Sequence, residues 1–420
     1  MRPHLSHARR FPPLAALTVA LVLTAALIVL MAPRASAATL DPVPSFGADP
    51  GNLAMHEYVP DGLPTGAPLV VLLHGCAQSA SDYHHHSGWA EQAEAFGIAL
   101  VYAEQKTSNN ATRCFNWFEP ADVARDSGEA RSIRSMVEYA IAEHGVDAER
   151  VYVSGLSAGG AMAAELLASY PDVFAGGSIV AGIPVGCATG MLDAFTCMNP
   201  GKNRTAEQWG DRIRAKLPDG AELPRVAVWH GTADTVVAPA NGDASVAQWV
   251  NAGGLSTTPD ATEELPGSTT ASYYGGGSDD ASLAHFSVAG LGHGTPVDPA
   301  TGCGSAGAYF LDSVCSTGYT AQFWGIAEGV EPTDPPTEEP TPEPTEGPSE
   351  PPTEEPTDPP AGECVTANNY VHVDEGRAVH RAGLTYAAGS DDPLGLWTMA
   401  ITTSLTETSP GHWEHMVDGC

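Results

Sequence analysis

Residues Arg150–Met162 have the sequence RVYVSGLSAGGAM, and this stretch decides the fold of the 420-residue chain. Residues 151–153 are β-branched or aromatic, which predicts a short buried strand. The segment Gly155–Gly159 follows at once, and the residues after it, AMAAELLASY, have the apolar spacing of a helix. The stretch therefore predicts a strand, a sharp turn with Ser157 at its centre, and a helix.

A strand, a G-x-S-x-G turn and a helix in this order form the nucleophile elbow of α/β-hydrolases. Gly155 and Gly159 allow a turn that is too sharp for flanking side chains, and the strained backbone lifts the Ser157 hydroxyl out of the sheet. The alternative is a Gly/Ser-rich turn that binds an anion at the start of a helix. Because the strand precedes the turn and the helix follows it, we favour the elbow.

The chain up to about Gly329 alternates between apolar strands and helices. Strands are expected near 53–59 and at 68–75, 98–103, 178–181, 225–230 and 284–288, and helices at 87–96, 127–144, 244–250 and 319–326. The run 68–75 (PLVVLLHG) is continuously apolar, which is typical of a strand buried on both faces of a parallel sheet. The sequence predicts the α/β class, with a doubly wound, mostly parallel α/β-hydrolase sheet in a catalytic domain at 38–330.

The two ends of the chain differ from this domain. Residues 1–37 combine early arginines, an apolar run and an A-x-A site, which predicts a cleaved signal peptide; an uncleaved membrane anchor is the alternative. Residues 331–363 repeat Pro, Thr and Glu, so they predict an extended, disordered linker. Residues 364–420 are expected to form a small substrate-binding domain, closed by its terminal cysteines.

The aromatic residues of this last segment have two interpretations. They are Tyr370, Tyr386, Trp397 and Trp413. They either fill a small core or face outward and bind an insoluble surface.

Charge and cysteine content narrow the class of protein. A formal net charge of −33 disfavours binding to nucleic acid or to an anionic membrane, and it fits a secreted chain that is kept soluble by its charge. We expect a monomer. Eight cysteines in an exported chain predict disulfides. Proximity in the sequence favours the pairs Cys187–Cys197 and Cys303–Cys315. Cys364 and Cys420 bracket the last domain and are expected to close it, which leaves Cys76 to pair with Cys114.

The sequence implies no cofactor and no metal. It has no C-x-x-C pair, so a zinc cluster is not favoured. The run His84–His86 could bind a metal adventitiously, but no carboxylate or Cys pattern supports a site, and we expect a solvated loop.

The nucleophile requires a base and an orienting acid, which follow an elbow serine in the order acid, then His. Asp234 lies just beyond a predicted strand, and His293 lies in the glycine-flanked loop GLGHG. We therefore predict Ser157 as nucleophile, His293 as general base and then acid, and Asp234 as the group that fixes the imidazole tautomer. Rival positions are Asp243 and Asp211 for the acid, and His285 and His230 for the base.

The oxyanion of an acyl-transfer intermediate requires backbone N–H donors. One is expected from Ala158, directly after the nucleophile, and the other from Cys76 in the loop HGCAQ. A Cys76–Cys114 bridge would stiffen that loop and bring a second segment towards the cleft as an apolar wall. The predicted substrate-binding residues are Gln78, Asn116, Trp117 and Phe118.

Five ordered motifs, HGCAQ, CFNWF, GLSAGGAM, WHGTAD and GLGHG, resemble those of esterases related to poly(3-hydroxybutyrate) (PHB) depolymerases, whose siblings are feruloyl and acetylxylan esterases. The resemblance covers about 53–329. The layout is similar to that of secreted short-chain polyhydroxyalkanoate depolymerases, although this linker is richer in Pro and Glu. In that family the His of the HG motif is assigned to the oxyanion site, which implies this role for His74.

The resemblance implies a secreted serine esterase that hydrolyses an insoluble polyester through an acyl-enzyme. One alternative is a feruloyl or acetylxylan esterase that acts on acylated cell-wall polysaccharide. The other is a non-catalytic surface-binding protein, which the presence of Ser157, Asp234 and His293 disfavours.

Overall fold

The computed structural model describes residues 38–327 and, in the C-terminal region, 364–368, 372, 377–381, 384–390, 393–396, 402–409 and 412–416. The predicted signal peptide and linker lie outside these ranges. Among the helices of the described residues, none combines the length and the apolar character that crossing a membrane requires.

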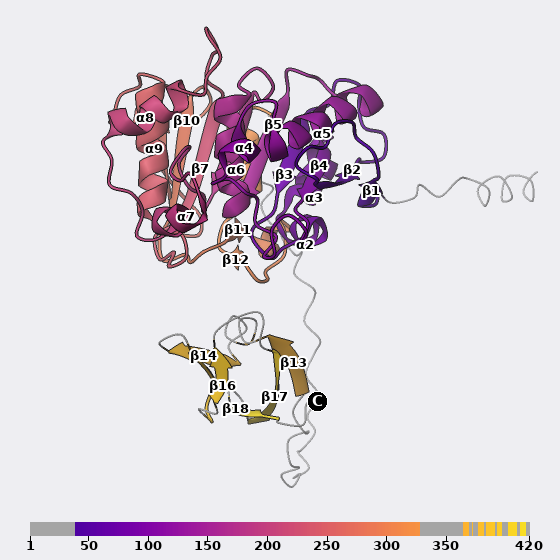
Figure 1. Cartoon of the computed structure of the whole chain (residues 1–420), viewed down its shortest axis with the longest axis vertical. Coiled ribbons are helices and arrows are strands. Elements are labelled where there is room, and N and C mark those ends of the chain that lie inside the picture. Colours follow the sequence, from indigo (N-terminus) through magenta and orange to yellow (C-terminus); the bar gives the residue numbers. More distant parts are fainter. Residues whose placement is uncertain are drawn as a thin grey trace, which may run out of the picture.

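The catalytic region is built on a ten-stranded sheet of order β1-β2-β4-β3-β5-β6-β7-β10-β9-β8 (Figure 1). The strands are β1 (Asp41–Val43), β2 (Ala54–Tyr58), β3 (Leu69–Leu73), β4 (Ala99–Glu104), β5 (Val151–Leu156), β6 (Gly176–Val180), β7 (Arg225–Gly231), β8 (Ala261–Leu265), β9 (Thr269–Tyr274) and β10 (Leu283–Val288). The centre, from β4 to β10, is parallel, and the pairs at both edges are antiparallel. The predicted mostly parallel sheet is confirmed.

Helices cover both faces of this sheet. They are α2 (Ala80–His86), α3 (Trp89–Phe96), α4 (Pro120–Val123), α5 (Gly128–His144), α6 (Ala158–Ser169), α7 (Met191–Met198), α8 (Ala206–Arg214), α9 (Ala240–Ala252) and α10 (Ser316–Phe323). Alternate residues of β3 enter different cores, because successive strand side chains point to opposite faces. Val71 packs in the core with α5, α6 and α9, whereas Val70 and Leu72 pack in the core with α2, α3 and α10. The predicted burial of this strand on both faces is confirmed.

The β8–β9 hairpin and helix α2 are among the elements that the sequence analysis did not predict. The β8–β9 hairpin adds an antiparallel edge, and β8 itself is largely exposed, so its sequence ATEEL carries no apolar alternation. The run His84–His86, expected in a solvated loop, instead forms the last turn of α2. That helix begins at a capping box between Ser79 and Asp82, a polar signal that outweighs the weak apolar pattern.

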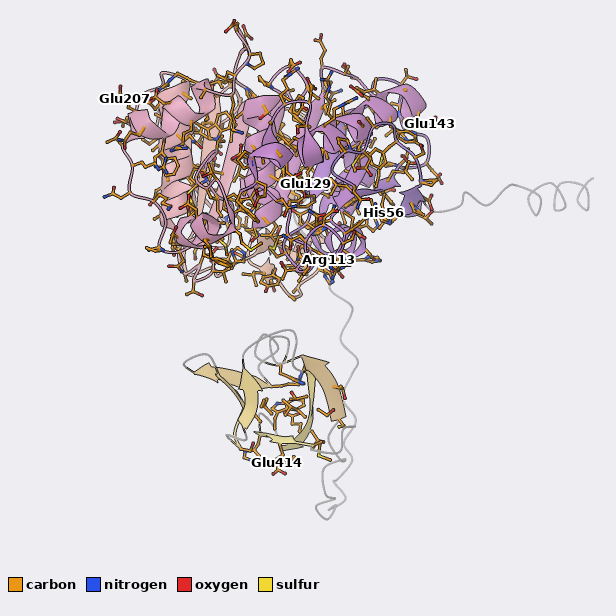
Figure 2. All side chains as sticks on the ribbon, in the orientation of Figure 1. His56, Arg113, Glu129, Glu143, Glu207 and Glu414 are labelled. Atoms are coloured by element: carbon orange, nitrogen blue, oxygen red, sulfur yellow. A yellow bond between two sulfur atoms is a disulfide. The ribbon has the colours of Figure 1, made fainter. Side chains whose placement is uncertain are left out.

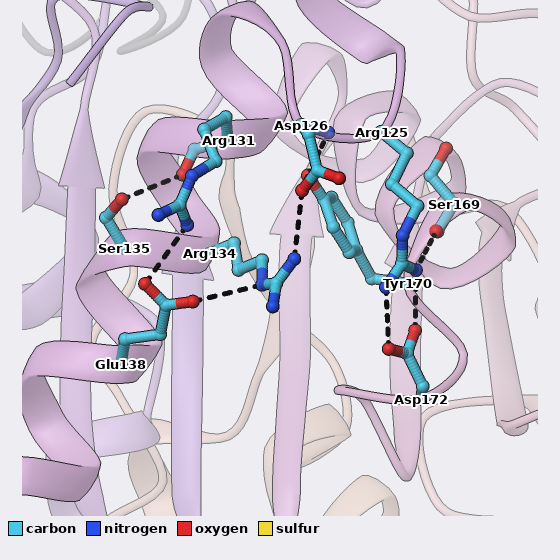
Figure 3. Close-up of polar contacts among 9 residues, drawn as sticks. All are labelled: Arg125, Asp126, Arg131, Arg134, Ser135, Glu138, Ser169, Tyr170 and Asp172. Atoms are coloured by element: carbon cyan, nitrogen blue, oxygen red, sulfur yellow. Dashed lines mark hydrogen bonds and ion pairs between the residues drawn. The ribbon is translucent and has the colours of Figure 1, made fainter. Parts of the chain in front are cut away.

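An arginine cluster fixes the far end of the elbow helix α6 (Figure 3). Arg125 binds Asp172 through two nitrogens, at 2.6 and 2.7 Å, and also donates to the carbonyl of Ser169. The Asp126 N–H donates to the Tyr170 hydroxyl at 2.6 Å. Because paired Arg–carboxylate contacts are directional, this cluster holds the carboxyl end of α6 against the segment that leads into α5.

The described C-terminal residues form two three-stranded sheets, ordered β13-β17-β18 and β14-β15-β16 (Figure 1). Their strands are β13 (Cys364–Asn368), β14 (Ala378–Arg381), β15 (Leu384–Ala387), β16 (Pro393–Leu396), β17 (Thr402–Ser409) and β18 (His412–His415). Trp413 is partly buried against a small core that includes Leu394 and Leu405. Cys364 is disulfide-bonded, whereas its expected partner, Cys420, lies outside the described residues, as do Tyr370 and Trp397.

Candidate active site

Ser157 lies between β5 and α6 with the backbone angles φ 56° and ψ −116°, which few non-glycine residues adopt. Both glycines of the turn are required by close approach. A Cβ on Gly155 would lie 2.3 Å from the Gly159 carbonyl oxygen, and one on Gly159 would lie 2.1 Å from the Leu73 oxygen. The Ser157 N–H donates to the Val180 carbonyl on neighbouring β6 at 2.9 Å. The turn is thus a strained, tightly packed elbow at the carboxyl edge of the sheet.

Asp234 and His293 are in direct contact. The Nδ1 of His293 lies 2.7 Å from Oδ2 of Asp234, and the second carboxylate oxygen accepts the N–H groups of Val236 and Val237 at 2.8 and 2.9 Å. Because the ionised Asp234 carboxylate can only accept a hydrogen bond, Nδ1 of His293 is the donor, and Nε2 is left as the basic nitrogen. The carboxylate therefore fixes the tautomer that a general base needs.

The electrostatics of Asp234 favour its ionised form. Burial acts to raise the pKa of Asp234, but hydrogen bonds from His230 and His293 and the charge of His293 outweigh burial and hold this pKa well below its usual range. The acid therefore remains a carboxylate at any pH at which His293 could act as a base.

The parallel strands bring Ser157 and His293 to one edge. Ser157 follows β5, Asp234 follows β7, and His293 follows β10, and the carboxyl ends of parallel strands lie together. The Ala233 N–H donates to the Leu291 carbonyl at 2.9 Å, which ties the acid loop to the His loop. No hydrogen bond joins Ser157 to His293 in the described part of the chain, and such catalytic bonds are often long until substrate binds.

The loop that carries His293 is held in place by the segment that follows it. It continues into β11 (Thr295–Val297), which pairs with β12 (Phe310–Asp312), and the Thr295 N–H donates to the Tyr309 carbonyl at 2.8 Å. The Cys303–Cys315 disulfide closes the segment that contains β12. The expected pairs Cys76–Cys114 and Cys187–Cys197 are also present.

The rival residues have other environments. Asp211 pairs with Arg214 at the surface, and Asp243 is exposed on α9. Burial lowers the pKa of His285 to about 4, which suits a neutral core imidazole. Among the described residues, no group of three or more His, Cys, Asp or Glu side chains is arranged to hold a metal ion.

His230 is the residue whose contribution sequence reasoning missed. Its Nε2 donates to the Val237 carbonyl at 3.0 Å and lies 3.5 Å from Oδ2 of Asp234, the oxygen that also contacts His293. The side chain is 4% exposed. Two imidazoles therefore converge on one carboxylate oxygen. The sequence contained one indication of this contact. His230 lies at the end of β7 and Asp234 lies four residues later in the loop that follows, so the turn of the chain brings them together.

The predicted oxyanion donors lie on two elements that meet. Ala158 is the first residue of α6, where helix N–H groups have no intrahelical partner. Neither its N–H nor that of Cys76 donates to another described residue. The Cys76 loop is clamped by its disulfide, by the Ala77 N–H bond to the Thr112 carbonyl at 2.7 Å, and by Arg113, which donates to the Ala77 carbonyl.

His74 holds the loop through its ring rather than pointing a free N–H at the cleft. Its Nδ1 contacts the Gly75 carbonyl at 2.6 Å, and its Nε2 accepts the Gln105 N–H at 3.1 Å. Burial lowers the pKa of His74 to about 4, so the ring is neutral. Both ring nitrogens are therefore engaged with backbone, and the ring ties the loop after β3 to the segment after β4.

The expected apolar wall is not formed by residues 116–118. Trp117 and Phe118 are 4% and 6% exposed and belong to the core beneath α5. The Asn116 amide is held at both ends, by Asn110 and by Glu129. The apolar character that suggested a cleft wall is explained by burial in the core, where the Cys76–Cys114 bridge anchors the segment from the other side.

Gln78 is likewise occupied inside the loop. Its Oε1 accepts the Gly75 N–H at 2.7 Å, and the side chain is largely buried. Its Nε2 has no partner among the described residues.

Glu129 is a buried carboxyl on α5, and Figure 2 labels it in the catalytic region. It accepts hydrogen bonds from the Asn116 N–H and side chain and from the Gln105 amide. Since Gln105 donates in turn to His74, one polar chain connects Glu129 to the oxyanion loop. Burial raises the pKa of Glu129 to about 8.

Comparison with known proteins identifies the chain. Residues 53–267 match the family described as Esterase PHB depolymerase. The sequence is 46% identical over 310 residues to poly(3-hydroxyalkanoate) depolymerase C of Paucimonas lemoignei, covering 73% of this chain and 74% of that protein. The chain belongs to the PHB depolymerase family of esterases. It is a carboxylic ester hydrolase, as the recognised motifs predict.

Other members of this esterase group are more distant. Feruloyl esterase B of Talaromyces stipitatus is 33% identical over 65% of this chain and 76% of its own length. Acetylxylan esterase of Coprinopsis cinerea is 32% identical over 63% and 71%, respectively. The solved acetyl xylan esterase of Aspergillus awamori has a TM-score of 0.59 and 25% identity, and the match covers 69% of this chain and all of that one.

The Glu129 carboxyl predicts a pH dependence of stability. The pKa of Glu129 in the folded protein, about 8, exceeds the ordinary glutamate pKa of 4.5, so between these values the folded state holds a proton that the unfolded state has released. The free energy of unfolding should therefore fall as pH rises from about 4.5 to 8. Urea titrations at several pH values on wild type and Glu129→Gln measure this, and the difference between them isolates Glu129. Parallel pH profiles of the two proteins would contradict the assignment.

His230 predicts a loss of turnover through Asp234. His230→Leu removes the imidazole whose Nε2 lies 3.5 Å from the Asp234 carboxylate, and it should lower kcat on a soluble short ester about tenfold, or about 1.4 kcal/mol, with KM unchanged. His230→Gln keeps an N–H near the position of Nε2 and should recover part of the loss. Equal losses in both variants, with normal thermal stability, would show that the contact with Asp234 is unimportant.

Proposed function

We propose that this chain is an extracellular polyester hydrolase that cleaves poly(3-hydroxybutyrate)-type esters. The observation that carries the chemistry is the contact of His293 with Asp234 at the sheet edge where the elbow presents Ser157. The substrate class is supported by the 46% identity to a poly(3-hydroxyalkanoate) depolymerase, against about 33% for the feruloyl esterases.

The proposed mechanism assigns a step to each of these groups. Ser157 Oγ attacks the ester carbonyl while His293 Nε2 takes its proton, and Asp234 stabilises the imidazolium. The N–H groups of Ala158 and Cys76 bind the oxyanion. Collapse of the intermediate expels the alcohol end of the polymer, which receives the proton from His293. Water, deprotonated by the same imidazole, then releases the hydroxyacid and restores Ser157.

The domain organisation is also a proposal. Residues 1–37 direct export, the enzyme works as a monomer outside the cell, and the disulfides fit an oxidising compartment. The linker 331–363 tethers a C-terminal substrate-binding domain, 364–420, to the catalytic domain at 38–330. Tethering raises the local ester concentration without changing the chemical barrier.

A cell-wall esterase is the second candidate. The acetyl xylan esterase of Aspergillus awamori supports it, because the structural match spans that whole chain. The two candidates share the same serine chemistry, so only the product distinguishes them. Release of 3-hydroxybutyrate from polymer supports the first, and release of ferulate or acetate from xylan with no attack on polymer supports the second.

Ser157→Ala tests the nucleophile. The variant should lose hydrolysis of both a soluble short ester and a polyhydroxybutyrate suspension, by a factor of about 10⁴ or more, while its adsorption to the particles is unchanged. Turbidity clearing, product release and a pull-down on particles measure these quantities. Labelling of wild type, but not of the variant, by a serine-directed fluorophosphonate is the control. An unlabelled wild type would favour a non-catalytic surface-binding protein.

Cleavage within 331–363 tests the tether. Insertion of a specific protease site there allows the same preparation to be compared before and after cutting. Cutting should leave the soluble-ester rate unchanged and lower the rate on solid polymer several-fold, because the local concentration effect is lost. An equal rate on solid polymer after complete cutting would remove the C-terminal segment from the function.

A further inference from the structure

Helix α7 exposes large apolar side chains. Met191, Leu192 and Phe195 are 55%, 86% and 60% exposed. Met191 and Phe195 are neighbours one turn apart, and Leu192 lies about 100° around the helix from Met191, so the three share one side of α7. Among the described residues, the other exposed large hydrophobic is Met416, in the C-terminal region. Clustered exposure of this kind marks an interaction surface more often than isolated exposed residues do.

The fold holds this face outward. The opposite side of α7 contains Ala194 and Cys197, which are buried, and the Cys187–Cys197 disulfide fixes the helix to the preceding loop. Rotation that buried Leu192 would break this inner contact. The apolar face, defined as Met191, Leu192 and Phe195, is therefore a fixed feature of the domain surface.

The apolar face belongs to the catalytic edge of the sheet. The carbonyl of Met198, the last residue of α7, accepts the N–H of Ala238 at 2.9 Å, and the next residue, Asn199, donates to the Thr235 carbonyl at 2.9 Å. Thr235 directly follows Asp234. In Figure 1, α7 lies at the same margin of the domain as α2, β11 and β12, and α2, β11 and α7 all follow carboxyl ends of parallel strands.

The local charge favours an uncharged occupant. Asp193 is the charged residue within α7, and it pairs with Lys202. The face thus presents no unpaired charge of its own in a chain whose formal net charge is −33. Three side chains that project from a short convex helix suit a flat apolar surface, whereas a second acidic copy of the chain would be repelled.

We propose that the apolar face of α7 seats the catalytic domain on the surface of a solid aliphatic polyester, beside the ester that Ser157 attacks. This contact is separate from the C-terminal domain and rests on the proposed polyester substrate. It would hold the catalytic edge against the solid after the tether has delivered the domain there.

The test compares two double variants of the full chain. Leu192→Ser with Phe195→Ser removes the apolar surface, and Leu192→Met with Phe195→Leu retains it. The first should lower 3-hydroxybutyrate release from an amorphous polyhydroxybutyrate film about tenfold, and the second should match wild type. Both should hydrolyse soluble p-nitrophenyl butyrate at the wild-type rate. Met416→Ser is a control for loss of an exposed apolar residue elsewhere, and thermal unfolding by circular dichroism checks the fold.

The outcomes separate this inference from the proposed function. A film rate unchanged in the serine variant overturns the inference while the polyester function stands. Equal losses on film and soluble ester also overturn it, because α7 would then act on the catalytic site. A wild-type dimer that the serine variant converts to monomer by light scattering would assign the face to a second copy. A wild type active on the soluble ester but inactive on film removes the polyester substrate, and the inference with it.

Discussion

The contact between the start of α6 and the end of β3 is the constraint on which the catalytic edge depends. Gly159 lies so close to the Leu73 carbonyl that any side chain at position 159 would clash with it. Leu73 leads directly into the loop that carries Cys76, and Gly159 follows Ala158. One close approach therefore sets the distance between the two proposed oxyanion donors, and the strained Ser157 backbone sets the nucleophile beside them.

Many of the polar contacts around this edge are made by buried side chains that lie next to the catalytic residues. His74, Gln105 and Glu129 form a buried chain of hydrogen bonds under the oxyanion loop, and His230 supports the carboxylate that contacts His293. Polar side chains are costly to bury unless they are hydrogen-bonded. Hydrogen-bonded chains of this kind make the catalytic edge more rigid.

Short-range patterns predicted the central strands well and the edges poorly. Residues 69–73 are apolar throughout because both faces are buried, so their burial was visible in the sequence. The edge strand β8 is mostly exposed, so it has no apolar pattern to detect. Trp117 and Phe118 were expected at the cleft but lie in the core. The sequence of an aromatic pair near a disulfide does not show whether the pair is buried or faces a cleft, because only packing distinguishes the two.

Local turn chemistry was enough to predict the elbow, and short separation was enough to pair Cys187 with Cys197 and Cys303 with Cys315. The Cys76–Cys114 pair followed only by elimination. Which side chains meet became clear only from the packed structure. It brings His230 to Asp234, engages both ring nitrogens of His74 with backbone, and leaves the apolar face of α7 exposed among the residues that the structure describes. These outcomes depend on contacts between segments far apart in the chain, and on which face of a helix its neighbours cover, which no local pattern encodes.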